Sequence, residues 1–170
     1  MSIALFTATS RGKFSGGPLT CRCAVGRGGV QPADQKREGD GASPMGVWPM
    51  RRVFYRPDRL RRPETALPCI PIQPQDGWCD DPDHALYNRP VSLPFGASHE
   101  VMWRDDHIYD LLVELGHNDD PVVPKLGSAV FLHLSRTDFS PTRGCVAIEL
   151  PDLLTAVAMS GPGTALEISY

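Results

Sequence analysis

The sequence predicts a mainly β domain with little helix, and three observations lead to this prediction. Prolines make up 17 of the 170 residues, and ten of them fall between Pro44 and Pro94. Proline lacks a backbone donor and clashes with the preceding helical turn, so this stretch cannot hold a long helix. Elsewhere, short apolar runs alternate with polar residues at a period of two, which is typical of half-buried strands. Glycine-rich turns separate several of these runs. We expect a single domain over residues 1–170.

The first half of that domain is expected to be rich in turns. Residues 1–30 alternate short apolar pieces with glycine turns, which predicts short strands and hairpins. Residues 31–46 are polar and rich in Gly, Asp and Ser, and predict a loop. Residues 47–55 predict a strand interrupted by Pro49. From residue 57 to residue 94 we expect a long irregular insertion held by aromatic and cysteine contacts.

The second half predicts more regular structure. Alternation over residues 109–115 indicates a half-buried strand that ends at Gly116. Apolar runs at residues 128–134 and 145–150 predict two further strands. Pro151 at a first helical position and Gly161 as terminator mark a short helix. The final alternating segment is expected to close a sheet.

Composition and charge exclude several classes of protein. Hydrophobic residues form 41% of the chain, enough to bury a core, and the net charge of −3 gives no general reason to bind nucleic acid. No stretch approaches the roughly 20 apolar residues of a membrane helix, and the N-terminus shows no signal peptide. The arginine-rich residues 51–62 form either a solvated face or a patch for a carboxylate-bearing partner.

His133 and Cys145 are the residues best suited to chemistry. His133 ends one apolar run, and Cys145 begins the next after a loop. An imidazole beside a thiol can accept its proton and stabilise the thiolate as an ion pair. Gly144 permits close approach of a substrate carbonyl, and the N–H groups of Gly144 and Cys145 could form an oxyanion site. The alternative is that Cys145 is an inert buried cysteine.

The segment around these residues resembles the active-site signature of YkuD-type L,D-transpeptidases, which cross-link bacterial peptidoglycan. The signature has a histidine, a loop and then [Ser/Thr]-x-Gly-Cys, and its residues fall on His133, Thr142, Gly144 and Cys145. A second similarity is Ser-Pro-x-Gly before an apolar residue, at residues 43–47. Gly-His-Asn at residues 116–118 follows a predicted strand, where the family builds a pocket wall.

The resemblance implies a β-sandwich-like L,D-transpeptidase catalytic domain with a short helix near its C-terminus and a long loop insertion. It implies a cysteine acyltransferase without metal or cofactor, in which Cys145 forms a thioester with a stem peptide and passes it to the amine of a second stem peptide. Carbapenem-type inhibitors are expected to acylate the same thiol. The implied substrate-binding residues are Ser43, His117, Asn118, Thr142 and Arg143.

The sequence departs from the family pattern at Leu134, Arg143 and Ala147, and the spacing from His133 to Cys145 is short. Cross-links of the 3-3 and the 1-3 type therefore both remain open. So do a peptidoglycan hydrolase with the same two residues (an L,D-carboxypeptidase or endopeptidase) and a non-catalytic wall-binding module. The substrate implies the periplasm or cell envelope.

Four other cysteines carry weaker expectations. Cys21 and Cys23 share one strand face, but a zinc site would need two more ligands, and none is convincing. Cys69 and Cys79 could form a disulfide in an oxidising compartment. The aromatic and polar residues at 78–81 and 87–89 either shape a peptide groove or pack as an Ω-like loop.

Overall fold

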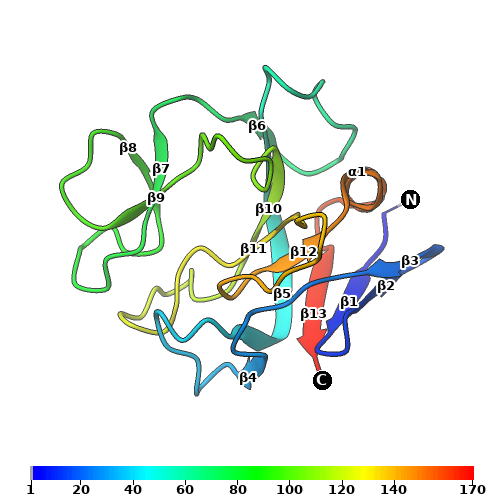
Figure 1. The fold of residues 1–170 in the computed structure, drawn as a ribbon, viewed down its shortest axis with the longest axis horizontal. Coiled ribbons are helices and arrows are strands. Elements are labelled where there is room, and N and C mark those ends of the chain that lie inside the picture. The colour runs from blue at the N-terminus through cyan, green and yellow to red at the C-terminus, as the bar shows by residue number, and fades with distance from the viewer. Residues whose placement is uncertain (1) are drawn as a thin grey trace.

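Strand β5 (Ser43–Tyr55) is shared by two sheets, and this sharing produces the sandwich. In the computed structural model, which describes residues 2–170, the first part of β5 pairs with β13 (Ala165–Ser169). Its second part pairs with β10 (Leu111–Leu115). Followed through β5, the strands form a ten-stranded sheet whose main path runs β12-β11-β10-β5-β13-β1-β2-β3. Figure 1 shows β5 in the middle of this arrangement.

The other elements extend the two halves of this sheet. On the β13 side the strands are β1 (Leu5–Thr9), β2 (Lys13–Gly16) and β3 (Leu19–Arg22). On the β10 side they are β11 (Phe131–Leu134) and β12 (Val146–Ile148). Two short strands add to β5 in parallel, β4 (Val30–Pro32) and β6 (Cys69–Pro71). The helix α1 (Leu150–Ala158) follows β12 directly.

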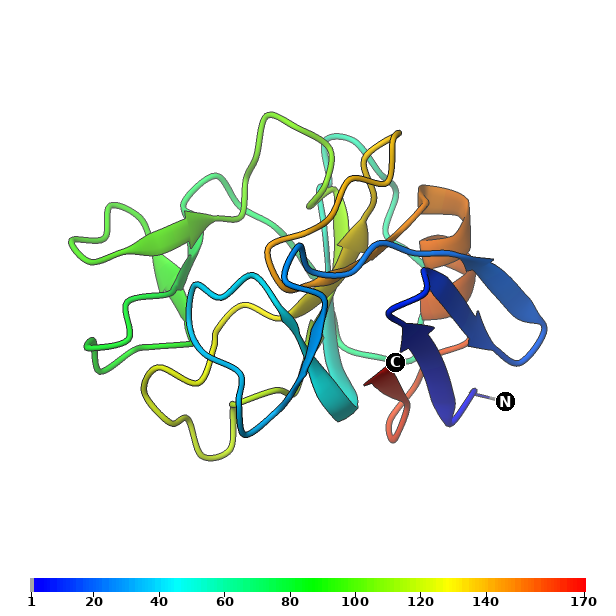
Figure 2. The same ribbon diagram turned by 60° about the horizontal axis from the view of Figure 1, so that its bottom comes forward.

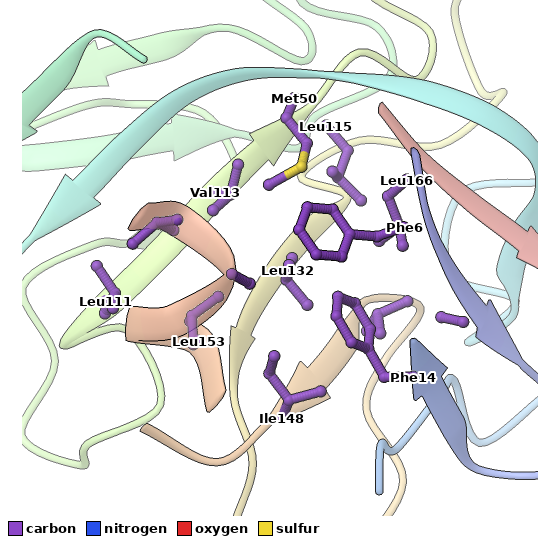
Figure 3. Close-up of a cluster of buried hydrophobic side chains, with 14 of the residues drawn as sticks. Phe6, Phe14, Met50, Leu111, Val113, Leu115, Leu132, Ile148, Leu153 and Leu166 are labelled. Atoms are coloured by element: carbon purple, nitrogen blue, oxygen red, sulfur yellow. The ribbon is translucent and has the colours of Figure 1, made fainter. Parts of the chain in front are cut away.

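The main core fills the space between the two halves. Figure 3 shows side chains from β1, β2 and β13 pointing toward those from β10, β11 and β12. Phe6 and Phe14 stack at 5.4 Å between ring centroids, and both are fully buried. The helix places Leu153, also fully buried, against the same core. Each such side chain contributes about 1.5–3 kcal/mol through burial.

The long insertion covers the outer face of the β10–β12 half. The insertion runs past its expected end at residue 94 to residue 109 and contains a three-stranded sheet of β7 (Asp76–Cys79), β8 (Pro90–Ser92) and β9 (His99–Val101), with β7 in the middle. Figures 1 and 2 both place this sheet at the end of the molecule away from β1–β3. A second apolar cluster lies beneath it, made of Phe54, Ile72, Trp78, Met102, Tyr109, Leu112, Ala129, Phe131 and Cys145.

The predicted β class is confirmed, with corrections to several elements. The strand expected at residue 47 begins at Ser43, inside the predicted loop, because that segment pairs with β4. The strand expected from residue 128 begins at Phe131, since Ala129 has a φ of +52°. Strand β10 is buried on both faces, because the insertion covers the outer one. The insertion itself is partly regular.

The structure shows ion pairs along the arginine-rich residues 51–62 and no disulfide between Cys69 and Cys79. Ion pairs neutralise much of the run, with Arg51 on Asp119 and Arg59 on Asp110. Cys69 and Cys79 are both free thiols, because one lies in the main core and the other in the small sheet. Within residues 2–170, no helix has the length and apolar character needed to cross a membrane.

Candidate active site

His133, in β11, and Cys145, the residue just before β12, lie on the same face of two neighbouring strands. In the parallel pair β11–β12, Leu132 lies opposite Val146, and both side chains point into the main core. Side chains alternate along a strand, so the residues on either side of these two point to the outer face. Phe131 and Cys145 accordingly belong to the outer cluster. His133, two residues from Phe131, projects from the same face as the thiol.

The thiol of Cys145 is held by the backbone. Its Sγ donates to the carbonyl oxygen of Ala129 at 3.2 Å and accepts from the N–H of Phe131 at 3.4 Å. The residue is only 7% exposed. Burial, followed by the charge of Glu100, raises the pKa of the Cys145 thiol to about 12. The resting sulfur is therefore a protonated thiol.

His133 is neutral and fixed in one tautomer. Its Nδ1 lies 2.9 Å from the carbonyl oxygen of Leu134, and because a carbonyl only accepts, Nδ1 carries the proton. The other ring nitrogen, Nε2, is left as a proton acceptor. The ring of Tyr109 packs edge-on against the imidazole at 5.4 Å. Burial lowers the pKa of His133 to about 4. Burial thus favours the neutral form of both groups, whereas the sequence led us to expect a thiolate–imidazolium ion pair, which stays a prediction.

Two hydroxyl groups converge on the backbone of Cys145. Both Thr142 Oγ1, at 2.7 Å, and Ser43 Oγ, at 2.9 Å, donate to its carbonyl oxygen. Ser43 Oγ also accepts from the N–H of Gly26 at 2.9 Å. Ser43 is fully buried, so its predicted contact with substrate has no support in this placement. Both hydroxyls hold the strand that carries the thiol.

Only glycine fits the backbone conformation and the space at position 144. Its φ is +131°, and a Cβ added there would lie 2.9 Å from the carbonyl oxygen of Ala42. Its N–H donates to Thr142 Oγ1 at 3.1 Å. The Gly144 N–H that we expected in an oxyanion site is therefore engaged within the turn.

The remaining predicted substrate residues lie in different surroundings. Arg143 is exposed and forms no ion pair within residues 2–170. His117 is buried, with its ring 4.8 Å from that of Trp48. Burial lowers its pKa to about 4, and its Nδ1 has no hydrogen-bond partner. The side chain of Asn118 bonds the backbone of Val123 and Gly127, which stabilises a turn.

From the sequence, residues 78–81 and 87–89 were singled out without a definite role, and Glu100 and Tyr109 were missed as site residues. Asn88 accepts from Trp78 Nε1 and from the N–H of Ala129, both at 3.0 Å, and so fixes the residue whose carbonyl oxygen accepts the hydrogen bond of the thiol. Tyr109 donates its hydroxyl to the carboxylate of Glu100 at 2.6 Å. The polar and aromatic character of residues 87–89 was a signal for the first contact. Nothing in the sequence around Glu100 indicated the second.

Neither of two surface cavities is lined by the thiol or the imidazole. One, of about 450 Å³, adjoins residues 22–26 together with Phe139 and Pro141. The other, of about 550 Å³, is lined by arginine and acidic residues, among them Arg52, Arg89 and Glu114. Within residues 2–170 no group of three or more His, Cys, Asp or Glu side chains could hold a metal ion.

Comparison with known proteins identifies the family of the chain. The YkuD family model, described as the L,D-transpeptidase catalytic domain, matches residues 9–168 of the 170. No curated protein and no solved structure gives a significant match. The matched range contains the strands from β2 to β12, the helix, most of β13, and both His133 and Cys145. The chain belongs to the YkuD family of L,D-transpeptidase catalytic domains.

Proposed function

We propose that this protein is a peptidoglycan L,D-transpeptidase in which Cys145 is the nucleophile and His133 the general base. The observation that carries the proposal is the placement of the His133 imidazole and the Cys145 thiol on one face of the adjacent strands β11 and β12, two register positions apart. The Nδ1–Leu134 hydrogen bond supports it, because it leaves Nε2 as the proton acceptor. Membership of a family that acts on the cell wall supports the substrate class.

In the acylation step, His133 Nε2 takes the proton of the Cys145 thiol as the sulfur attacks a stem-peptide carbonyl that follows an L-centre. The C–S bond forms, and the carbonyl oxygen carries the negative charge. When the tetrahedral intermediate collapses, the C–N bond breaks and the protonated imidazole gives its proton to the leaving amine. The products are a thioester on Cys145 and a neutral His133.

The acylation step can begin from a protonated Cys145 thiol and a neutral His133 imidazole. Because burial raises the pKa of the thiol and lowers the pKa of the imidazole, both groups favour their neutral forms before attack. Proton transfer then accompanies formation of the C–S bond, where the developing charge moves onto the substrate oxygen. A thiol that stays protonated in the resting enzyme also resists oxidation, which proceeds through the thiolate.

Transfer completes the reaction when the amine of a second stem peptide attacks the thioester. The new amide is a 3-3 link if the donor carbonyl belongs to diaminopimelate and a 1-3 link if it belongs to L-alanine. If water attacks instead, the protein is the hydrolase that we keep as the second candidate. Exposed Arg143 is suited to pair with a stem-peptide carboxylate in either case. The substrate places the protein in the periplasm or cell envelope under this proposal.

Mass spectrometry after incubation with a carbapenem tests the nucleophile. We expect one covalent adduct, abolished in Cys145→Ala and retained in Cys69→Ala, which removes another buried free thiol. An unmodified wild-type protein would instead favour a wall-binding module. Purified monomeric muropeptides then separate the two reactions: dimers identify a transpeptidase, and shortened monomers identify a hydrolase. Tandem mass spectrometry of the dimers assigns the 3-3 or 1-3 link.

A further inference from the structure

The strand register of the small sheet directs Glu100 toward the thiol. In the antiparallel pair β7–β9, Glu100 lies directly opposite Trp78, so their side chains project from the same face. Trp78 packs edge-on against Phe131 at 5.1 Å, and the N–H of Phe131 donates to the sulfur of Cys145. The face of the small sheet that bears Glu100 is therefore the face that covers the reactive residues.

Tyr109 connects this carboxylate to the imidazole. Its hydroxyl donates to Glu100 Oε2 at 2.6 Å, while its ring packs at 5.4 Å from the ring of His133. Tyr109 is buried, whereas Glu100 retains partial exposure to solvent. The Tyr109 hydroxyl and ring therefore fix the position of the Glu100 carboxylate relative to His133.

Glu100 has no cationic partner of its own within residues 2–170. The neighbouring guanidinium of Arg104 is engaged by both carboxylate oxygens of Asp106, at 2.8 and 2.7 Å. The other charged groups that face Glu100 are Asp80 and Glu38, both acidic. Burial, partly opposed by the Tyr109 hydrogen bond, raises the pKa of the Glu100 carboxyl. An unpaired carboxylate here disfavours a thiolate at Cys145, so it does not serve ionisation of the nucleophile.

We propose that Glu100 binds the ammonium group of the acceptor stem peptide and accepts its proton, which makes the amine a nucleophile toward the thioester on Cys145. This inference rests on the transpeptidase function proposed above. An ammonium ion is the chemical complement of a fixed, half-buried carboxylate, and only the free amine can attack. The hydroxyl of Tyr109 holds the carboxylate in place.

The protons balance over the transfer. The acceptor ammonium gives one proton to the Glu100 carboxylate and becomes a free amine, whose nitrogen attacks the thioester carbon. His133 Nε2 takes the second proton from that nitrogen. The C–S bond then breaks, and the protonated imidazole returns its proton to the departing thiolate. Glu100 releases its proton to solvent, and both residues are restored.

The experiment compares acylation and transfer in the full chain carrying Glu100→Gln. Acylation is measured as the rate of carbapenem adduct formation, and transfer as muropeptide dimer formation relative to hydrolysed monomer. We expect acylation at least as fast as in the wild type, because loss of the Glu100 charge lowers the pKa of the Cys145 thiol, and dimer formation reduced about 10²-fold, at the low end of general-base effects. The hydrolysed fraction should rise. Glu100→Asp should recover part of the dimer yield, and Glu64→Gln, an exposed carboxylate of the same insertion, should behave as wild type.

The pH profile supplies a second measurement that a purely structural role would not change. Wild-type dimer formation should lose activity on the acid side as Glu100 becomes protonated. In Glu100→Gln this acid limb should be replaced by a steady rise with pH that follows the free-amine fraction of the acceptor. Tyr109→Phe, which keeps the carboxylate but removes its hydrogen bond, tests the arrangement without removing the charge, and should show a smaller loss of dimer.

The outcomes separate this inference from the proposed function. A wild-type protein that forms neither adduct nor dimer contradicts the transpeptidase itself. A wild type that forms both, with Glu100→Gln and Tyr109→Phe unchanged in dimer yield and pH profile, overturns the role of Glu100 alone. Equal losses of acylation and transfer in Glu100→Gln would assign the carboxylate to the donor peptide and also overturn the proposal. Circular dichroism of each variant shows that the fold is retained.

Discussion

The hydroxyl of Ser43 donates to the carbonyl oxygen of Cys145 at 2.9 Å, joining residues 102 positions apart. Ser43 begins the strand shared by both sheets, so the backbone at the thiol is tied directly to the centre of the sandwich. Thr142 donates to the same oxygen from within the turn before the thiol. One contact is long-range and the other local, and together they set the position of the nucleophile.

Ser43→Ala should lower the free energy of unfolding by about 1–3 kcal/mol, because it leaves the buried N–H of Gly26 without its acceptor. Urea denaturation measures the change, and Thr137→Ala, at an exposed residue, serves as the control. Thr142→Val combined with Ser43→Ala should cost more than the sum of the single changes, since the Cys145 oxygen then loses both donors. Strict additivity would contradict this account.

Gly144→Ala should destabilise the protein and slow carbapenem acylation. The new Cβ would meet the carbonyl oxygen of Ala42 at 2.9 Å, in a conformation that L-residues rarely adopt. The matched control is Gly163→Ala, which has a φ of +91° and nothing within 4 Å of the added carbon. The control should cost about 1–2 kcal/mol from backbone strain alone. Gly144→Ala should cost about 1–3 kcal/mol more from overpacking, measured by thermal denaturation. Equal losses would exclude the steric contribution.

The reactivity of Cys145 toward a small alkylating reagent should rise about tenfold per pH unit from pH 6 to pH 9 without a plateau. With the thiol pKa raised to about 12, the thiolate fraction keeps increasing throughout that range. Cys145→Ala supplies the background from the other cysteines. An inflection between pH 6 and pH 7 would reveal a thiolate–imidazolium ion pair and contradict the neutral resting state.

Stability should fall as the pH is lowered from about 6.5 toward 4. Burial lowers the pKa values of His117 and His133 to about 4 from 6.5 in the native protein. In this window the unfolded chain binds protons that the native state does not, which favours unfolding as pH decreases. Each histidine contributes roughly 3 kcal/mol by this linkage. Thermal denaturation should show a shallower pH dependence for His117→Gln, and an unchanged slope would contradict the assignment.

Much of the fold follows from local patterns that the sequence displays directly. Alternation located β10 and β13, and the short apolar runs located β11 and β12. The small sheet was not predicted, because its three-residue strands β8 and β9 are too short for a periodic signal. The burial of β10 on both faces depends on the insertion above it, which no local window contains.

The residues of the site also fall into those that a local sequence pattern predicts and those that depend on tertiary contacts. His133 and Cys145 were predicted because residue type and position in a short segment indicate them. The role of Ser43 as a backbone donor depends on a contact between distant residues. Glu100 depends on the register of one strand pair, and a shift of one residue would turn its side chain away. Interactions of this kind are set by the tertiary structure and leave no local pattern.

The two faces of the β10–β12 half pack against different parts of the protein. This arrangement affects which residues can be substituted during evolution without loss of the fold. The inner face carries the main core, while the outer face carries the thiol beneath the insertion. Substitutions in the insertion can remodel the surroundings of the nucleophile with little effect on the packing between the sheets. Divergence of substrate preference is therefore expected to accumulate in residues 57–109, while the sandwich constrains the position of the reactive pair.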